Sequence, residues 1–152
     1  MTATALCADL DPQTLRSAYG AYPSGVVAVA AQVRGRLTGI AASSFTSVSI
    51  DPPLVSFSVA TTSSTWPLLR EAAHLGVSVL ADHHDAVCRQ LAGPRDQRFT
   101  GLPFRSTEDG AVLLDEAVAT FDCSIQQEVE AGDHVIVVLA GMESSPPSLR
   151  CV

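Results

Sequence analysis

The strongest constraint on the fold is a long pattern of alternating hydrophobicity between residues 117 and 140. Ala119, Phe121 and Cys123 occupy every second position in its first half, with polar residues between them. A turn at Ala131-Gly132-Asp133 leads into the apolar run Val135–Ala140. Alternation with a period of two is typical of a half-buried strand, and a glycine-containing turn between two such runs predicts an antiparallel hairpin. The chain must therefore build an antiparallel sheet.

Further strand signals lie N-terminal to this hairpin, as runs of apolar or β-branched residues bounded by turn-forming residues. Proline donates no hydrogen bond to a sheet, so Asp51-Pro52-Pro53 must end a strand. Val55, Phe57 and Val59 then alternate with serines, which predicts a strand with one apolar face and one hydroxyl face. The predicted segments are a strand at 26–31, a turn at 34–36, a strand region at 38–50, a strand at 55–59 and a short buried strand at 77–80.

Three helices are predicted from capping residues and from glycine or proline stops. They are a helix over 9–22 behind Asp11-Pro12, a helix over 66–73 capped by Thr65 and ended by Gly76, and a helix from Asp82 to about Ala92 that ends before Gly93-Pro94.

The order of these elements predicts the fold class. Antiparallel strands with two inserted helices favour a mainly β barrel with helical excursions, and no βαβ rhythm indicates a parallel sheet. A chain of 152 residues suits one core, so we expect a single domain over 1–152.

Charge and cysteine usage restrict the partners and the compartment. The formal net charge is −7 and no basic run is present, so we expect no nucleic acid partner. No apolar run is long enough to cross a membrane and no signal peptide is evident, so we expect a cytoplasmic protein. The four cysteines form no C-x-x-C motif, which favours free thiols. Only 16% of residues are charged, and we expect a second subunit to cover apolar surface.

Several catalytic classes lack their motifs. The sequence contains no G-x-G-x-x-G, G-x-x-x-x-G-K-[ST], G-x-S-x-G or H-E-x-x-H motif. His84 and Cys88 are four residues apart, but a zinc site needs three or four ligands, so we expect no metal. No serine is marked as a nucleophile by a nearby histidine and acid.

Serine and threonine are concentrated in residues 43–47 and 61–65, each beside a predicted strand. The second stretch precedes a predicted helix, whose N-terminal N–H groups favour an anion such as a phosphate. The alternative is that these residues only form polar turns and a helix cap.

The order of six motifs resembles the flavin reductase family of the FMN-binding split barrel, the reductase components of two-component flavin-dependent monooxygenases. The resemblance covers about residues 15–142. It rests on RSAYGAYPSG (16–25), GIAASSFTSVSIDPPLV (39–55), SSTWP (63–67), VSVL (77–80), DQRFTG (96–101) and AGDH (131–134).

This resemblance implies a fold, an activity and a site. The fold would be an antiparallel, Greek-key-like split β-barrel. The activity would be NAD(P)H:flavin oxidoreduction, with FMN or FAD as flavin and NADH or NADPH as co-substrate. The protein would be a homodimer that supplies reduced flavin to a monooxygenase.

The implied site residues fall into groups. The flavin would lie against Ser43, Ser44, Thr46, Ser47, Ser58, Val59 and Ala60, its phosphate against Ser64 and Thr65, with further contacts from Gln90 and Leu91. The nicotinamide nucleotide would lie against Leu37, Thr38, Gly39, Ile40 and Ala41. His134 is either a polar group at the nicotinamide edge or a turn residue that caps Asp133.

Two departures from the family pattern bear on these residues. Relatives often carry Asn at position 43 and Lys or Asn at position 61, where this chain has Ser43 and Thr61, so the shorter side chains offer a flavin fewer partners. Relatives also continue beyond the last strand, where this sequence reads SSPPSLRCV, and we expect the C-terminal edge of the site to be either missing or supplied differently.

Two alternatives to the reductase remain open at this stage. One is a flavin-binding or electron-carrying split-barrel dimer with little turnover, or a remnant that only docks a partner. The other is a split-barrel oxidase that acts on its own small substrate.

Overall fold

A computed structural model describes residues 11–142, and its strands form two antiparallel sheets. In the larger sheet the order is β2-β1-β5-β8-β9-β4-β3, and β6 and β7 pair separately. The strands are β1 (Val27–Val33), β2 (Arg36–Ala42), β3 (Thr46–Ser49), β4 (Leu54–Ala60), β5 (Leu75–Val79), β6 (Phe104–Ser106), β7 (Val112–Leu114), β8 (Ala119–Ala131) and β9 (His134–Met142). The helical segments are α1 (Pro12–Gly20), α2 (Trp66–Leu69), η1 (Asp82–His84), α3 (Asp85–Leu91) and η2 (Arg95–Gln97).

The strand pattern confirms the mainly β, antiparallel fold. Strands β8 and β9 form the predicted long hairpin, whose turn contains Gly132 at a positive φ of 64°. Strand β4 places Phe57 and Val59 in the core, as its alternation predicts. Strand β1 is buried on both faces, as its uninterrupted apolar run predicts.

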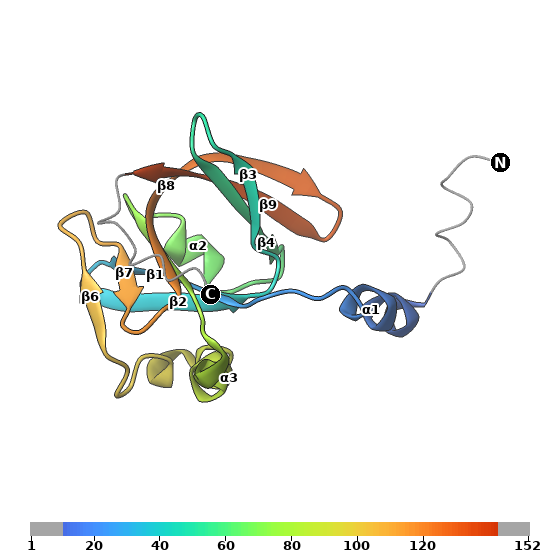
Figure 1. The fold of residues 1–152 in the computed structure, drawn as a ribbon, viewed down its shortest axis with the longest axis horizontal. Coiled ribbons are helices and arrows are strands. Elements are labelled where there is room, and N and C mark those ends of the chain that lie inside the picture. The colour runs from blue at the N-terminus through green and yellow to red at the C-terminus, as the bar shows by residue number, and fades with distance from the viewer. Residues whose placement is uncertain (1–10, 143–152) are drawn as a thin grey trace.

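The sheet curls into a barrel that is open along one seam (Figure 1). The chain passes from β2 at one edge of the sheet to β3 at the other, and from β4 across the β8–β9 hairpin to β5. These long connections between antiparallel strands fit a Greek-key-like arrangement. Strand β3 pairs only with residues 54–56 of β4, so the end of β4 at Ser58–Ala60 lies beyond β3 and faces β2 across the seam.

Two hydrophobic clusters lie on opposite faces of β1 because side chains alternate along a strand. Val27 and Val29 point into the barrel, where Phe57 and Trp66 meet edge to face with ring centroids 5.6 Å apart. Ala28 and Ala30 point the other way, into a cluster beneath α3 and β7. The small alanines allow α3 and β7 to approach the sheet closely.

The helix predicted over 66–73 is wrong in length and in its stop. Helix α2 ends at Leu69, and Gly76 lies within β5. A Cβ on Gly76 would stand 2.0 Å from the carbonyl oxygen of Val112, so glycine is needed there for the close crossing of β7 over β5. The packing requirement, and not a helix stop, explains this residue.

Two other predicted boundaries also differ. The strand region 38–50 is broken at residues 43–45 into β2 and β3, which lie on opposite edges of the sheet. Asp82 does not cap α3; instead the ring Nδ1 of His84 accepts a hydrogen bond from the backbone N–H of Ala81 at 2.9 Å.

Helix α1 lies away from the barrel, joined to it by an extended segment (Figure 1). Asp11 caps it as predicted, accepting hydrogen bonds from the backbone N–H groups of Gln13 and Thr14. None of its residues is buried. Within residues 11–142, no helix is long and apolar enough to cross a membrane. Cys7, Cys151 and the C-terminal residues 143–152, on which the sequence predictions also bear, lie outside the described residues.

Candidate active site

A pocket of about 390 Å³ opens at the seam between β2 and β4, and we call it the seam pocket. It brings together residues from the two stretches rich in serine and threonine, from the neighbouring strands and from the β8–β9 turn. Its lining consists of Ile40, Ala41, Ala42, Ser43, Ser44, Ser58, Val59, Ala60, Ser63 and His134.

One serine joins the two sides of the seam. The hydroxyl of Ser44 accepts a hydrogen bond from the backbone N–H of Ser58 at 2.8 Å and donates to the carbonyl of Ser58 at 3.0 Å. This side chain thereby takes the place of a neighbouring strand at the end of β4. The Ser44 hydroxyl is engaged within the protein and positions the pocket wall.

The free edge of β2 supplies backbone groups to the seam pocket. The carbonyl of Gly39 accepts a hydrogen bond from Arg98, so the backbone groups of Gly39 face away from β1. Backbone groups alternate between the two sides of a strand, and those of Ala41 therefore face the same free edge. Since Ala41 lines the seam pocket, its N–H and C=O are available to a bound molecule.

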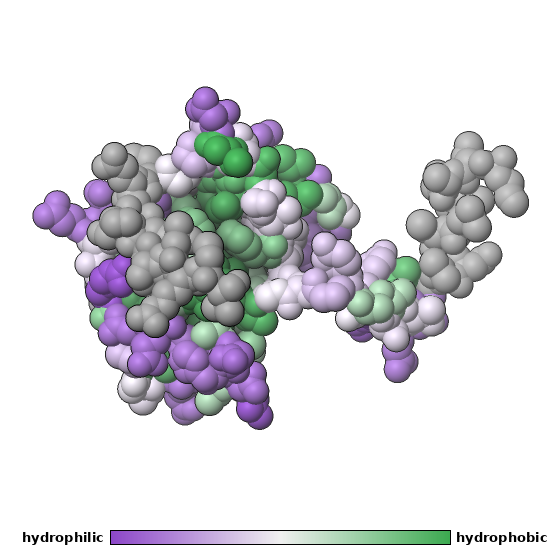
Figure 2. Space-filling view, in the orientation of Figure 1, coloured by the Kyte–Doolittle hydropathy of each residue, from purple (hydrophilic) through white to green (hydrophobic). Residues whose placement is uncertain are grey.

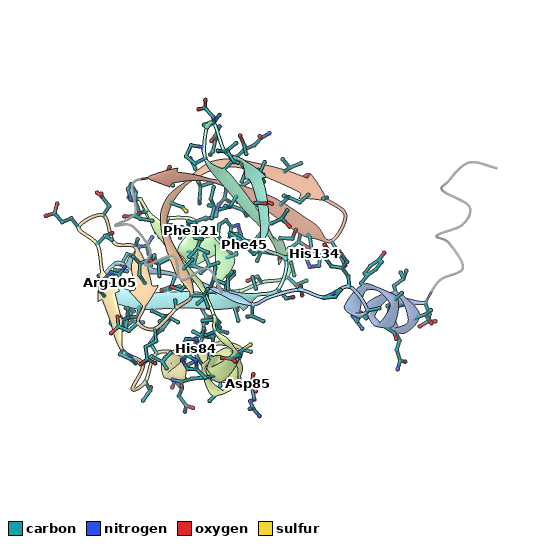
Figure 3. The ribbon with its side chains drawn as sticks, in the orientation of Figure 1. Phe45, His84, Asp85, Arg105, Phe121 and His134 are labelled. Atoms are coloured by element: carbon teal, nitrogen blue, oxygen red, sulfur yellow. The ribbon has the colours of Figure 1, made fainter. Side chains whose placement is uncertain are left out.

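His134 stands where β9 begins, and its ring lies at the end of the barrel nearest α1 (Figure 3). Its Nδ1 donates to the carboxylate of Asp133 at 2.8 Å, and this hydrogen bond lowers the pKa of Asp133. The backbone N–H and the hydroxyl of Thr61 both donate to the carbonyl of Asp133. His134 thus makes the turn contact and also lines the pocket, leaving Nε2 as its unbonded ring nitrogen among the described residues.

A second and larger hollow of about 780 Å³ lies further along β2, and we call it the arginine cleft. It is formed by the start of β2, the loop before α2 and the segment around η2. Its lining consists of Gln32, Gly35, Arg36, Leu37, Thr38, Gly39, Thr65, Leu68, Arg95, Asp96, Arg98, Phe99 and Thr100.

Arg98 holds the walls of this cleft together. Its Nε donates to the carbonyl of Gly93 at 2.9 Å, and its Nη1 donates to the carbonyl of Gly39 at 2.9 Å and to the hydroxyl of Thr65 at 3.0 Å. Burial, and then the neighbouring cation of Arg95, lower the pKa of Arg98. The guanidinium is therefore a partly desolvated charge held by neutral acceptors.

The predicted site residues divide between these two hollows. Ser43, Ser44, Ser58, Val59, Ala60, Ile40, Ala41 and His134 line the seam pocket, and Leu37, Thr38, Gly39 and Thr65 line the arginine cleft. Thr46, Ser47, Ser64, Gln90 and Leu91 are not among the lining residues. Leu91 is buried in the cluster beneath β1, and the side-chain amide of Gln90 donates to the carbonyls of Gln97 and Thr100.

The phosphate loop at Ser64 and Thr65 stays a prediction, but the expected helix cap by Thr65 is wrong. The hydroxyl of Ser63, not of Thr65, caps the start of α2, accepting from the N–H groups of Thr65 and Trp66 at 3.3 and 3.2 Å. The hydroxyl of Thr65 is buried and accepts from Arg98. The N–H groups of Thr65 and Trp66 are thus already used, whereas no group among the described residues engages the N–H or the hydroxyl of Ser64.

Sequence reasoning assigned no role to three residues that the geometry brings forward, namely Ser63, Arg95 and Arg98. The motif DQRFTG at 96–101 was visible and contains Arg98. Its partners Gly39 and Thr65 are distant in sequence, however, so only the fold shows what this arginine binds.

Three possible metal ligands, His83, His84 and Glu116, lie close together, and Figure 3 shows His84 near α3, apart from His134. The Nδ1 of His84 accepts from the N–H of Ala81, which fixes the hydrogen of the neutral ring on Nε2. A ring nitrogen that carries hydrogen does not bind a metal. The group therefore offers two free ligands instead of three, too few for a structural zinc site.

Comparison with known proteins identifies the family of this chain. The model of the flavin reductase like domain family matches residues 19–148. A flavin reductase of Pseudomonas putida is 41% identical over 130 residues, which are 85% of this chain and 76% of that protein. This chain belongs to the flavin reductase-like family. The resemblance found in the sequence motifs is thereby confirmed.

Other members of the family differ in length and name. The reductase component of a flavin-dependent trigonelline monooxygenase from Acinetobacter baylyi is 38% identical over 82% of this chain but only 40% of its own length. An NADH:FAD oxidoreductase of Streptomyces globisporus, solved with NAD and FAD fragments, is 31% identical with a TM-score of 0.82, over 91% of this chain and 87% of that one. The flavin reductase-like fold thus extends over nearly all of the described residues.

Proposed function

We propose that this flavin reductase-like chain is an NAD(P)H:flavin oxidoreductase that reduces FMN or FAD and passes the reduced flavin to a partner monooxygenase. The observation that carries this proposal is the seam pocket, where the hydroxyl-rich segment before Phe45, the end of β4 and His134 meet around one hollow. This pocket has no pair of carboxylates among its lining residues, and hydride transfer requires none.

The residues of the seam pocket fit a flavin ring. Its volume lies in the range of small-molecule sites, and Ile40 and Val59 give it apolar walls. The N–H of Ala41 and the hydroxyl of Ser43 are neutral donors, which suit the carbonyl oxygens and ring nitrogens of a flavin. These residues would hold the ring, and Ser44 would hold the wall behind it.

A bound flavin would supply the redox chemistry, accepting a hydride from the nicotinamide. The protein's part is to bind and orient. The N–H of Ala41 would stabilise negative charge that develops on the ring, as preorganised donors do in other enzymes. The Nε2 of His134 would accept a hydrogen bond from the nicotinamide carboxamide, while Asp133 holds the ring in place.

Oxidation of NADH and NADPH with added FMN, FAD or riboflavin tests this proposal. We expect steady turnover with at least one flavin and release of reduced flavin that a separate oxygenase can use. A yellow protein without turnover would instead favour the flavin carrier. Turnover confined to an added small substrate would favour the oxidase.

The replacement His134→Ala tests the residue at the nicotinamide edge. One hydrogen bond is worth on the order of 1 kcal/mol, so the KM for NAD(P)H should rise several-fold while flavin affinity stays nearly constant. If this variant loses flavin and keeps its nicotinamide kinetics, His134 only stabilises the turn.

We also propose that the chain is a homodimer in the cytoplasm. A helix of nine residues is marginal in water on its own, yet α1 buries none of its residues, and Tyr19 and Tyr22 are exposed. Figure 2 shows apolar surface on the barrel below the β3–β4 turn, where Val48 and Ile50 are exposed. A second copy would cover these groups. Cys88 and Cys123 are free thiols, which suits a reducing compartment.

Light scattering of the wild type and of a Tyr19→Ser, Tyr22→Ser double variant tests the dimer. We expect twice the chain mass for the wild type and a shift toward the monomer for the variant. A wild type that is monomeric throughout would overturn the proposal.

A further inference from the structure

The turn that joins β5 to α3 is closed by two hydrogen bonds between the same two residues. The ring Nδ1 of His84 accepts from the backbone N–H of Ala81 at 2.9 Å, and the backbone N–H of His84 donates to the carbonyl of Ala81 at 3.1 Å. Helix α3 begins at the next residue and has no side-chain cap of its own. This reciprocal pair therefore fixes the start of α3, beside which Figure 3 shows His84.

The bond from Ala81 depends on the protonation state of His84. The side chain is buried, with the residue 8% exposed, and its ring centroid lies 4.2 Å from that of His83. A neutral ring accepts at Nδ1 and carries its hydrogen on Nε2, whereas a protonated ring carries hydrogen on both nitrogens. Protonation would place a second donor against the N–H of Ala81. The turn is thus closed in only one protonation state.

The charged groups that act on this ring come from two elements. His83 and Asp82 belong to η1, and Glu116 lies in the turn between β7 and β8. Burial has the largest effect and lowers the pKa of His84 below its ordinary value of 6.5. His83 lowers this pKa further, whereas Glu116 and Asp82 act in the opposite direction. The closed turn therefore favours the neutral ring.

Helix α3 has few contacts of its own that could replace this closure. Leu91 is its single fully buried residue, and Val87 packs partly against the second hydrophobic cluster. Its charged residues Asp85 and Arg89 are exposed, and Arg89 donates to the backbone carbonyl of Asp85. A helix of seven residues is marginal without tertiary support. The segment can therefore open locally while the sheet stays folded.

We propose that His84 is an acid-sensitive switch, whose neutral ring holds η1 and the start of α3 closed and whose protonation releases them from the barrel. This inference goes beyond the proposed function and does not depend on it. In the open segment water solvates the ring, which then binds a proton at its ordinary pKa of 6.5. Opening is therefore independent of pH well above 6.5 and becomes more favourable as the pH falls toward the lower pKa of the closed state.

Hydrogen exchange of the full-length chain tests this switch between pH 7.5 and pH 5.5, with the rates corrected for the intrinsic pH dependence of exchange. The amides of residues 81–91 report the opening, and those of β1 report global unfolding. We expect residues 81–91 to lose protection by about five- to tenfold at pH 5.5 relative to pH 7.5. The protection of β1 should change much less.

Two replacements of His84 separate its bond from its charge. The amide oxygen of Asn can accept from Ala81 and does not titrate, so His84→Asn should keep the segment closed at both pH values. His84→Ala removes the acceptor, so the segment should exchange quickly at pH 7.5 already. His83→Asn is the matched control, because this neighbouring ring is exposed and does not bond to Ala81. It should retain most of the pH dependence.

Protection of β1 shows in each variant that the sheet is folded. An equal pH dependence in the wild type and in His84→Asn would overturn the proposal, since the proton would then bind elsewhere. A parallel loss of protection in residues 81–91 and in β1 would also overturn it, because the acid effect would be global unfolding. No flavin or nicotinamide enters the measurement, so its result is independent of whether the reductase function holds.

Discussion

The seam pocket and the arginine cleft share strand β2 but are built in different ways. The seam pocket consists of strand edges and is closed by the two hydrogen bonds of Ser44 to one residue of β4. The arginine cleft is closed by a single long side chain, Arg98, that joins β2, the loop before α2 and Gly93 in the segment after α3.

This difference shows which chemistry each hollow favours. Backbone edges and hydroxyls are neutral, directional donors and acceptors, which suit a flat heterocycle. A partly buried guanidinium without a carboxylate partner suits a charged oxyanion. The two hollows therefore offer different chemistry to a ligand, and variants that affect one and not the other can test this division.

The largest effect is expected for Gly76→Ala, which disturbs the support beneath both hollows. The added Cβ would meet backbone atoms of Val112 at 2.0 to 2.8 Å, and backbone cannot move aside as a side chain can. We expect a loss of about 3 kcal/mol or more in the free energy of unfolding, measured by urea denaturation.

Gly25→Ala is the control for this experiment, since a Cβ at Gly25 meets nothing within 4 Å. A Gly76→Ala protein that is as stable as the control would show that β7 does not cross β5 so closely.

A smaller effect, restricted to the arginine cleft, is expected for Gly39→Ala. Its Cβ would lie 2.5 Å from the ring of Phe99 and 3.0 Å from Ala30 and the carbonyl of Val29. The ring must move into the cleft, which should cost about 1 to 3 kcal/mol and weaken pyrophosphate binding. The double variant with Phe99→Leu should recover part of both losses. Recovery of neither would mean that the strain lies in the backbone of β1.

Ser44→Ala is expected to affect the seam pocket alone. It leaves the N–H and C=O of Ser58 without their partner, at a cost of about 1 to 3 kcal/mol in unfolding free energy. Flavin affinity should fall while pyrophosphate affinity stays unchanged. Ser47→Ala, on the exposed strand β3, serves as the stability control. Equal stability of both variants would argue against the stabilising role of the Ser44 hydrogen bonds.

The smallest expected effect is a change of protein stability with pH, and it involves neither hollow. Burial lowers the pKa of His84 below its ordinary value of 6.5, and the nearby His83 lowers it further. The unfolded chain therefore takes up this proton at a higher pH than the folded chain does. Stability is greatest above pH 6.5 and falls as the pH drops toward the folded pKa.

Urea denaturation at pH 7 and pH 5 measures this change. His84→Gln should weaken the pH dependence of the unfolding free energy, and His83→Gln should retain most of this dependence. An equal slope in the wild type and in His84→Gln would assign the dependence to other groups.

Sequence reasoning predicted those features that local pattern determines. The alternation in β4 and β8, the turn at Gly132 and the Asp11 cap were all visible over a few residues. The helix beyond Leu69 was wrong, because the crossing of β7 at Gly76 overrides local helix propensity. The cap of α3 at Asp82 was wrong because Asp82 lies within η1, and α3 begins only at Asp85.

The candidate site likewise combines features that a local pattern predicts with contacts that only the fold reveals. The hydroxyl-rich segments pointed to the seam pocket, yet nothing in them distinguished Ser44, which closes the seam, from Ser43 beside it. Arg98 was missed because its partners Gly39 and Thr65 lie 59 and 33 positions away. Contacts between such distant residues depend on the strand order, which periodicity does not reveal.

The common wall formed by β2 has a thermodynamic consequence. Arg98 binds the carbonyl of Gly39, and the backbone groups of Ala41 two residues later face the seam pocket. A ligand in the arginine cleft that moves Arg98 also moves the free edge of β2. It therefore changes, by some factor, the affinity of the seam pocket for its own ligand. Linkage requires the occupant of the seam pocket to change affinity in the cleft by that same factor, so the two ends of a nucleotide would bind as coupled and not as independent fragments.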